Sequence, residues 1–366
     1  MHVAATDGPK GTARRVAVDG RHLCGQRTGI GVWLGELVSR WAAAGHAVSV
    51  LVPDGCELPL QVHTVPLRGP FHLSALRWAR RERCAYLSPD SLIVPSLLGR
   101  SAAVAVHDLV PLELPDLQHL RARLAYRFLL GAATRRCGLI IVPSDATRRD
   151  LTRRFADASA RTHVVPEAAR TLPPAGPLPE GVRPPFVLFA ATLEPRKRPA
   201  ELVRAFARGA PEGWQLVLAG KRGWLPREDV STLEHFRGSD RVVELGYVSD
   251  ATLAALLVNA SILAYPTAYE GFGLPVLEGM AAGVAVLATT TPAVREVAGE
   301  AAMLVELDGN ESFEDRLGVA LRRLMSDAEL RADLAAAGRM RAAQFSWDTA
   351  AAAVWALLIG LAGTRP

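Results

Sequence analysis

A proline-rich segment, residues 171–185, is the feature that most constrains the fold of this sequence. Its sequence, TLPPAGPLPEGVRPP, suits neither a helix interior nor a central strand, because proline lacks the backbone N–H and its ring fixes φ. Short apolar runs alternate with helix-like stretches on both sides of it. At 366 residues the chain also exceeds the size at which one hydrophobic core stops growing. We therefore predict two domains joined by a linker at this segment.

The short apolar runs have the composition of buried parallel strands. They are continuous rather than alternating, as expected for strands that helices cover on both faces of a sheet. The runs are residues 16–18, 47–52, 103–106, 139–142 and 163–165 before the linker, and residues 186–191, 215–219, 242–245, 262–264, 284–288 and 303–305 after it. Helices are expected between them, for example over residues 31–44 and 120–136. The pattern predicts an α/β protein with two Rossmann-like, doubly wound domains.

The predicted domain boundaries follow from this alternation. We expect an N-terminal Rossmann-like domain over residues 1–175, with a flexible leader at residues 1–13 that lacks the apolar core of a signal peptide. A C-terminal Rossmann-like domain is expected over residues 176–345. Residues 346–366 should form a helix that could pack back on the N-terminal domain, since their apolar part is too short and alanine-rich to predict a membrane span. Ligands of such sheets bind beyond the carboxyl ends of the strands, so facing domains would enclose a cleft.

The charge pattern argues against a nucleic-acid-binding protein. The formal net charge is +5, but basic residues are dispersed among acidic ones. No zinc-finger spacing, recognition-helix signature or aromatic RNA-binding motif is present. We expect the basic excess to serve an anionic small molecule or an anionic membrane face. Peripheral membrane contact through residues 76–83 and 120–136 stays open, although ordinary amphipathic surface helices are the favoured interpretation.

The cysteine pattern is typical of a protein from a reducing compartment. Cys24, Cys56, Cys84 and Cys137 are far apart and include no C-x-x-C. Neither a zinc site nor a disulfide framework is therefore expected. A cytoplasmic location is the simplest interpretation.

The most informative segment runs from Glu270 to Glu278 and reads EGFGLPVLE. It follows an apolar run, its glycines let the backbone approach a ligand closely, and Pro275 can open a helix. Amides at a helix start can hold a diphosphate, which the helix dipole also favours. Carboxylates on both sides of a glycine-rich bend suit the acceptance of sugar hydroxyl hydrogen bonds at two ends of an extended ligand.

This segment resembles the donor-binding motif of the retaining glycosyltransferases of family 4, the large sucrose-synthase and mannosyltransferase-like group with the two-domain GT-B fold. The wider region, residues 246–302, is similar to that family throughout. The resemblance implies that Glu278 binds the nucleotide ribose and that Glu270 meets the donor sugar. It also implies donor contacts from the loop between them, with its backbone near the sugar and its last residue near the phosphates: Gly271, Phe272, Gly273 and Leu274.

Two adjacent cations follow the first apolar run of the second domain, in the sequence TLEPRK. The resemblance implies that an arginine and a lysine at this turn neutralise the departing diphosphate, which stabilises charge in the transition state. Lys197 matches the family's lysine, but Thr192 stands where the family usually has its arginine. Arg196 is the candidate to support Lys197. Whether it or another arginine does so is open.

Polar residues also end a predicted strand of the first domain, where His107 and Asp108 follow a buried run. The resemblance implies that His107 reaches the donor sugar from across the cleft, while Asp108 could orient the imidazole or a loop. Gly29 and Gly31 resemble the N-terminal glycine loop of the family, which borders the phosphates and the acceptor.

The remaining candidates follow later strands of the second domain. Tyr247 and Val248, in the sequence GYVSD, resemble the edge that faces the nucleobase in the family. Lys221, in AGKRG, stands out because the chain otherwise uses arginine for nearly all its cations. It also lies just after a predicted strand, where ligands tend to bind.

These features predict a retaining, metal-independent glycosyltransferase. It would move a sugar from a GDP- or UDP-linked donor, with GDP-mannose as the first choice, to a hydroxyl of a glycan, lipid or secondary metabolite. No D-x-D cluster suggests a divalent metal, and the cationic turn can replace one, so no cofactor is expected. No second carboxylate is placed for a double displacement. The resemblance implies front-face attack, with the departing phosphate helping to take the acceptor proton.

Other classes of protein share this architecture. A sugar-nucleotide epimerase or hydrolase would turn over the donor without an acceptor, and a non-catalytic protein would only bind the nucleotide sugar. A nicotinamide-dependent dehydrogenase is disfavoured, because the first apolar run is not followed by G-x-G-x-x-G.

Overall fold

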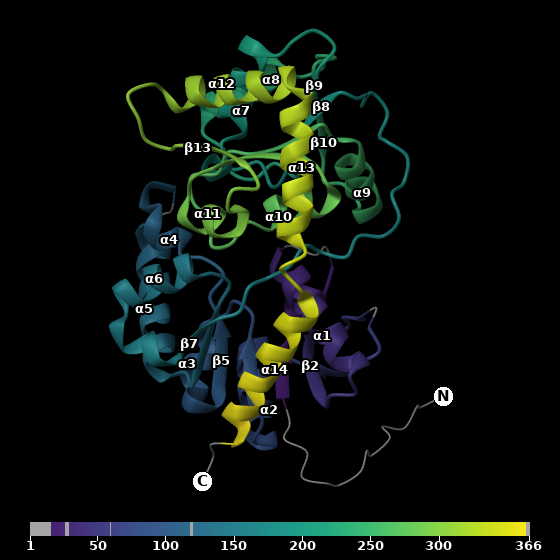
Figure 1. The fold of residues 1–366 in the computed structure, drawn as a ribbon. Coiled ribbons are helices and arrows are strands. Elements are labelled where there is room, and N and C mark those ends of the chain that lie inside the picture. Colours follow the sequence, from purple (N-terminus) through teal and green to yellow (C-terminus); the bar gives the residue numbers. More distant parts are fainter. Residues whose placement is uncertain (1–15, 26–28, 59, 118–119, 364–366) are drawn as a thin grey trace. The chain divides into compact units, whose positions relative to one another are not determined.

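The computed structural model describes residues 16–25, 29–58, 60–117 and 120–363 (Figure 1). The leader predicted for residues 1–13 lies outside the described residues. The chain divides into two compact units. The first unit comprises residues up to 105, residues 132–140 and residues from 351 onward, and the second unit comprises residues 106–131 and 141–350. The predicted boundary after residue 175 lies within the second unit and stays a prediction.

Two parallel sheets organise the fold. The larger sheet has the strand order β3-β2-β1-β4-β5-β6-β7, and the smaller sheet has the order β10-β9-β8-β11-β12-β13. The strands are β1 (Val16–Asp19), β2 (Val48–Pro53), β3 (His63–Leu67), β4 (Ala85–Ser88), β5 (Ala102–Ala105), β6 (Leu139–Val142), β7 (Thr162–Val164), β8 (Phe186–Ala190), β9 (Gln215–Ala219), β10 (Val242–Gly246), β11 (Ile262–Tyr265), β12 (Ala285–Thr289) and β13 (Met303–Val305). In both sheets the winding reverses beside the first strand, between β1 and β4 and between β8 and β11, as in a Rossmann fold.

Helices connect the strands. They are α1 (Gly29–Ala43), α2 (Phe71–Glu82), α3 (Ile93–Leu98), α4 (Val110–Glu113), α5 (Leu120–Arg136), α6 (Asp145–Arg154), α7 (Pro199–Gly209), α8 (Arg227–His235), α9 (Asp250–Asn259), α10 (Leu274–Ala282), α11 (Pro292–Ala298), α12 (Phe313–Ser326), α13 (Ala328–Ala342) and α14 (Trp347–Gly363). The helices predicted over residues 31–44 and 120–136 correspond to α1 and α5. The alternation of strands and helices confirms the predicted α/β class.

Two strands, β3 and β4, are additional to the predicted ones. β3 contains Pro66 and largely exposed or half-buried side chains, and it lies at the edge of its sheet, where proline is tolerated. β4 is four residues long and fully buried. Neither strand was among the apolar runs from which strands were predicted.

Buried apolar side chains fill both faces of the smaller sheet. One cluster includes Leu188 and Val217 and contains residues of α9 and α10. The other includes the sequence neighbours Val187 and Leu216 and contains residues of α7 and α12. Successive residues of a strand enter opposite clusters because strand side chains alternate between faces. This explains why these strands are continuously apolar.

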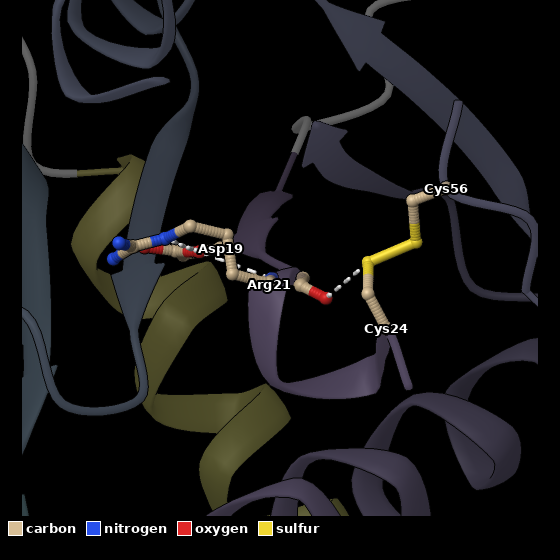
Figure 2. The surroundings of a disulfide bond; sticks show 5 residues. Asp19, Arg21, Cys24 and Cys56 are labelled. Carbon is tan, nitrogen blue, oxygen red and sulfur yellow. Dashed lines mark hydrogen bonds and ion pairs between the residues drawn. A yellow bond between two sulfur atoms is a disulfide. The ribbon is translucent and has the colours of Figure 1, made fainter. Parts of the chain in front are cut away.

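The first unit contains a disulfide, which corrects the interpretation of the cysteine spacing. Cys24 and Cys56 are bonded through their Sγ atoms (Figure 2). Cys24 follows β1 and Cys56 follows β2. These strands are parallel neighbours with Asp19 opposite Leu51, so residues beyond their carboxyl ends come together although they are 32 positions apart in the sequence. The expectation of no disulfide was wrong, and the cysteines therefore give no support to a reducing compartment.

The C-terminal helix α14 contributes to the first unit from Ala351 onward. There the indole N–H of Trp41 donates to the Ala351 carbonyl at 2.8 Å, and the ring of Trp355 stacks on that of His46 with centroids 4.3 Å apart. Among the described residues, Ala328–Gly363 is the stretch long and apolar enough by composition to cross a membrane, with a mean hydropathy of 1.5 and 28% of its most apolar window buried. The stretch is divided between α13 and α14 at residues 343–346.

Candidate active site

The two most informative sequence segments meet beyond the carboxyl ends of β8 and β11. These are the central strands between which the winding of the smaller sheet reverses, the position where ligands bind in such sheets. The cationic turn with Arg196 and Lys197 follows β8, and the glycine-rich loop that begins near Glu270 follows β11. A backbone hydrogen bond of 2.6 Å from Ala268 N to the Arg196 carbonyl joins the two segments directly.

Three side chains donate hydrogen bonds to one oxygen of the Glu270 carboxylate. Tyr265 donates to Oε1 at 2.6 Å and Thr267 at 3.2 Å, and the Arg196 guanidinium donates to the same atom. The Glu270 side chain is 11% exposed. Burial alone would raise the pKa of Glu270, but attraction to Arg196 and Lys197 together with these hydrogen bonds lowers it below the usual value. Glu270 is therefore an ionised carboxylate held in a fixed orientation.

Arg196 and Lys197 have different surroundings. Arg196 pairs with Glu194 at 2.8 Å and with Glu270, and it also donates to the Tyr269 carbonyl at 3.1 Å. Burial would lower the pKa of Arg196, but attraction to Glu270 and other nearby groups raises it. Lys197 forms a longer ion pair of 3.8 Å with Glu194, and burial lowers its pKa. Arg196 is thus occupied by carboxylates, whereas the Lys197 ammonium is held less tightly.

Glu278, one turn into α10, is buried and paired with a different cation. Arg170 donates from both Nε and Nη2 to the two oxygens of the carboxylate, and it also contacts Asp250 at 3.3 Å. Burial raises the pKa of Glu278, and attraction to Arg170 offsets this only in part. A cavity of about 250 Å³ lies beside the pair. Apolar residues make up much of its lining, among them Leu172, Pro173, Leu257 and Val258.

Glycines fix the shape of the loop between the two carboxylates. A Cβ at Gly271 would lie 1.7 Å from the His107 carbonyl oxygen, so a larger residue cannot occupy this position without movement of the backbone. Gly273, with φ of 112°, adopts the left-handed region just before α10. The Gly271 carbonyl accepts hydrogen bonds from Ser144 at 2.6 Å and Thr147 at 2.9 Å, both at the start of α6. The loop is therefore held on several sides.

Phe272 and Leu274, the other predicted loop residues, are placed so that a ligand could contact their backbone groups. Phe272 is 5% exposed, and its ring lies edge-on to Phe345 with centroids 5.9 Å apart. This anchors the loop in the hydrophobic core. Leu274 is the first residue of α10, where backbone amides have no partner within the helix.

His107 lies in the same unit as these groups. Its Nδ1 is 3.1 Å from Oε1 of Glu167, a carboxylate that is 4% exposed and follows β7. A carboxylate at Nδ1 fixes the orientation of the ring and directs Nε2 the opposite way. Asp108 accepts a hydrogen bond from Val110 N at 3.1 Å. Asp108 was expected to orient either the imidazole or a loop, and this hydrogen bond fits the orientation of a loop.

The remaining candidates belong to segments other than the two that carry this cluster. Tyr247 is 51% exposed, and Val248 packs partly buried against the core of the smaller sheet. The side chain of Lys221 is exposed. Gly29 and Gly31 open α1 in the first unit, and the preceding Thr28 lies outside the described residues.

Several residues of the cluster were not predicted from the sequence. Tyr265 and Glu167 had a usable signal, because one ends a buried strand and the other closely follows one. Thr267 also follows β11 closely. Arg170 had none, since the sequence does not show that it reaches Glu278, 108 positions away.

Protein side chains supply the positive charges at the site. In the described part of the chain, no group of three or more His, Cys, Asp or Glu residues is arranged to hold a metal ion. The basic groups beside the two loop carboxylates are Arg170, Arg196 and Lys197.

Two family profiles match successive parts of the chain. The profile described as "Glycosyl transferases group 1" matches residues 177–341, and that described as "Glycosyltransferase Family 4" matches residues 27–171. The chain belongs to the family 4 glycosyltransferases. This confirms the resemblance carried by the Glu270–Glu278 segment.

Relatives of this family 4 glycosyltransferase include mannosyltransferases. O-antigen chain mannosyltransferase B of Escherichia coli is 28% identical over 362 residues, which cover 88% of this chain and 93% of that protein. The MMP alpha-(1->4)-mannosyltransferase of Mycolicibacterium hassiacum is 33% identical over 219 residues, which cover 58% of this chain and 52% of that protein.

Solved structures confirm the GT-B fold of this glycosyltransferase. Sucrose-phosphate synthase of Thermosynechococcus elongatus matches with a TM-score of 0.76 at 21% identity, over 94% of this chain and 98% of that one. HepE of Anabaena, solved in complex with UDP-glucose, matches with a TM-score of 0.71 at 17% identity, also over 94% of this chain and 98% of that one.

Proposed function

We propose that this glycosyltransferase transfers a sugar from a nucleoside diphosphate donor to an acceptor hydroxyl, with retention of anomeric configuration and without a metal. One observation carries the proposal: the ionised Glu270 carboxylate lies beside Lys197, beyond the two central strands of the smaller sheet. A fixed anion suits sugar hydroxyl groups, and a neighbouring cation suits a phosphate. The two groups divide the recognition of a sugar nucleotide between them.

The donor extends from Glu270 to Glu278 along the glycine-rich loop. Glu270 and the backbone of Gly271, Phe272 and Gly273 contact the sugar, and the amides around Leu274 face the diphosphate. Glu278 accepts hydrogen bonds from the ribose hydroxyls. The base lies at the edge formed by Tyr247 and Val248.

Arg170 makes the ribose site adjustable. Its guanidinium contacts both Glu278 and Asp250. When ribose hydroxyls donate to Glu278, Arg170 keeps the Asp250 contact and balances the charge of both carboxylates. The donor thereby replaces part of an existing hydrogen-bond arrangement, so the Glu278 carboxylate stays paired.

Lys197 carries the charge stabilisation at the leaving diphosphate. Arg196 is held by Glu194 and Glu270, so it acts mainly by fixing the turn and the orientation of Glu270. In this proposal Arg196, and not a residue at the position of Thr192, supports Lys197, and it does so through Glu194, which pairs with both cations. Amides at the start of α10 add partial positive charge on the same side as the phosphates.

Two mechanisms give retention, front-face attack and double displacement. The hydrogen bonds and the lowered pKa of Glu270 favour front-face attack. A nucleophilic carboxylate must be free to form a bond to the anomeric carbon. Glu270 accepts three hydrogen bonds on Oε1 and has a lowered pKa, which makes it a weak nucleophile. The departing phosphate takes the proton of the acceptor hydroxyl instead. His107, oriented by Glu167, contacts the donor sugar.

Mannose is the proposed sugar, because the relatives named above are mannosyltransferases. UDP-glucose is the second candidate, since HepE was solved with it. The first test is a melting-temperature comparison with GDP-mannose and UDP-glucose, since a ligand that binds only the folded state raises the melting temperature. The donor that shifts it more is then used in transfer assays with EDTA present, and NMR identifies the anomer formed.

Replacement of Lys197 by alanine tests the role of the cationic turn. We expect Lys197→Ala to lower the rate of transfer about 100-fold, as found for the loss of one electrostatic transition-state contact. The melting shift with donor should persist in reduced form. An inverted product, a requirement for metal or unchanged transfer by Lys197→Ala would contradict the proposal. Release of an epimer or free sugar without any acceptor would favour an epimerase or hydrolase.

A further inference from the structure

An exposed tryptophan stands beside the cationic turn. Trp224, between β9 and α8, is 62% exposed. A cavity of about 440 Å³ opens next to it, and its lining includes the carboxylate-bearing residues Asp116 and Glu194 together with Leu117 and Arg196. An aromatic ring that lines a cavity together with a few polar side chains is a common feature of ligand sites.

The position of Trp224 is fixed by the same backbone that carries the turn. Beyond β8 and β9 the chain continues as a short parallel bridge between Leu193 and Arg222. Leu193 N donates to the Lys221 carbonyl, and Gly223 N donates to the Leu193 carbonyl, both at 2.9 Å. A Cβ at Gly223 would lie 3.1 Å from that carbonyl oxygen, so the approach is close. Trp224 therefore follows directly from a paired segment.

A salt-bridge pair steadies this segment from the other side. Arg222 contacts Glu244 at 2.6 Å and also contacts Glu234 at the end of α8. The residue before Gly223 is therefore anchored to β10 and α8. These contacts position the segment before Trp224 without any ligand, which favours a preformed site.

The chemistry of the lining matches a pyranose ring. One face of a pyranose carries C–H groups with small positive charge, which pack on the electron-rich face of an indole. Its rim carries hydroxyl groups, which donate to carboxylates. Asp116 is exposed, and Glu194, although paired with Arg196, retains acceptor capacity because a carboxylate has about four lone-pair sites. A hydrocarbon chain would leave these carboxylates poorly solvated.

We infer that Trp224 is the stacking platform for a pyranose of the acceptor, so that the acceptor of this enzyme is a carbohydrate. The inference rests on the proposed function and specifies its acceptor class. Arg196 connects the two sites, because it is one of the residues that line the cavity and its side chain pairs with Glu270, the carboxylate assigned to the donor sugar. A pyranose on Trp224 would therefore lie one side chain away from the donor site.

A pyranose could also come from the donor, and the position of Trp224 favours the acceptor. The donor loop is tied to the carbonyl of Arg196 through Ala268 N. The segment just before Trp224 lies against the earlier residues of the turn, because a Cβ at Gly223 would lie 3.6 Å from the Cβ of Glu194. The two substrates would thus approach the turn from different ends.

The test compares Trp224→Ala and Trp224→Phe with Met340→Ala, a matched control that shortens another exposed apolar side chain, 68% exposed on α13. Transfer is measured with the donor chosen by melting shift and with p-nitrophenyl α-mannoside, α-glucoside and α-galactoside as acceptors. We expect Trp224→Ala to raise the acceptor KM at least tenfold while the donor KM changes less than twofold. Trp224→Phe should stay within about threefold, because an aromatic face remains. Met340→Ala should match the wild type.

Each other outcome overturns the inference. If the acceptor KM is unchanged in Trp224→Ala, Trp224 is not a stacking platform for the acceptor. If the donor KM rises instead, Trp224 contacts the donor sugar. If the donor melting shift is present but none of the pyranosides accepts sugar, the acceptor is of another class. If no sugar nucleotide shifts the melting temperature, the proposed function itself fails, and this result is separate from the other three.

Discussion

Glu270 and Glu278 stand at the two ends of one loop, and both are buried, yet their surroundings shift their ionisation in opposite directions. Glu270 has two cations nearby and two hydroxyl donors, and its pKa is lowered. Glu278 has one arginine, while Asp250 and Glu167 repel its charge, and its pKa is raised. Burial is similar for the two side chains, so the difference arises from the number and sign of their neighbours.

This difference indicates a division of labour within the loop. A carboxylate with several fixed donors keeps its charge and its orientation when a substrate arrives, as electrostatic preorganisation requires. A carboxylate with one movable partner can exchange that partner for hydroxyl groups of a ligand. We therefore interpret Glu270 as the fixed group near the reacting sugar and Glu278 as the exchangeable group for the ribose.

Replacement of the fixed carboxylate should have the largest effect. Glu270→Gln leaves Arg196 and Lys197 near a neutral amide, and loss of one partner from a buried ion pair costs about 3 kcal/mol of folding stability. We expect the rate of transfer to fall about 100-fold and the free energy of unfolding to drop by about that amount. Both are measurable, by kinetics and by urea denaturation. If Glu270→Gln keeps near-normal transfer, Glu270 is not the fixed group.

Removal of the movable partner should have an intermediate effect. Arg170→Ala leaves Glu278 as an unpaired buried carboxylate and raises its pKa further, so we expect donor affinity to fall about tenfold in isothermal titration, equivalent to about 1.4 kcal/mol. The rate at saturating donor should change little. The control is Arg295→Ala, because Arg295 and its partner Glu306 are both well exposed and such pairs contribute little. Equal or tighter donor binding by Arg170→Ala would show that Arg170 only blocks the site.

The smallest effect, and the most direct test of the comparison, is the pH dependence of stability. Glu270 has a lowered pKa in the folded state, so the stability of the wild type relative to Glu270→Gln should be fully present above the usual value of 4.5 and be lost as pH falls through the folded value. Glu278 has a raised pKa, so stability relative to Glu278→Gln should be highest below 4.5 and be lost as pH rises through the folded value. Urea denaturation between about pH 2.5 and about pH 7 measures both differences. Slopes of the same sign would refute the comparison.

The sequence predicted the parts of the molecule that repeat a general pattern. Continuous apolar runs identified most strands, and the EGFGLPVLE and TLEPRK segments identified Glu270, Glu278, Arg196 and Lys197, because a motif carries its own local geometry. Contacts between distant segments were out of reach. The Arg170–Glu278 pair and the Cys24–Cys56 disulfide depend on which segments become neighbours in the fold, and spacing along the chain does not encode that.

Functional residues in the segments after strands also escaped prediction. Glu167 lies two residues after a predicted strand, and its role became visible only with its distance to His107. Trp224 gave no signal in the sequence, because its meaning depends on being exposed beside a cavity. Propensity and periodicity report burial and secondary structure, while side-chain partnerships depend on tertiary packing.

The support of Gly271 by α6 has a practical consequence for engineering. Ser144 and Thr147 donate to the Gly271 carbonyl, and Glu296 accepts from the amides of Asp145 and Ala146. A chimaera that exchanges everything after the proline-rich segment would import a foreign loop onto a native helix start. When donor preference is transferred from another enzyme, the first turn of α6 should therefore be exchanged together with the transplanted half.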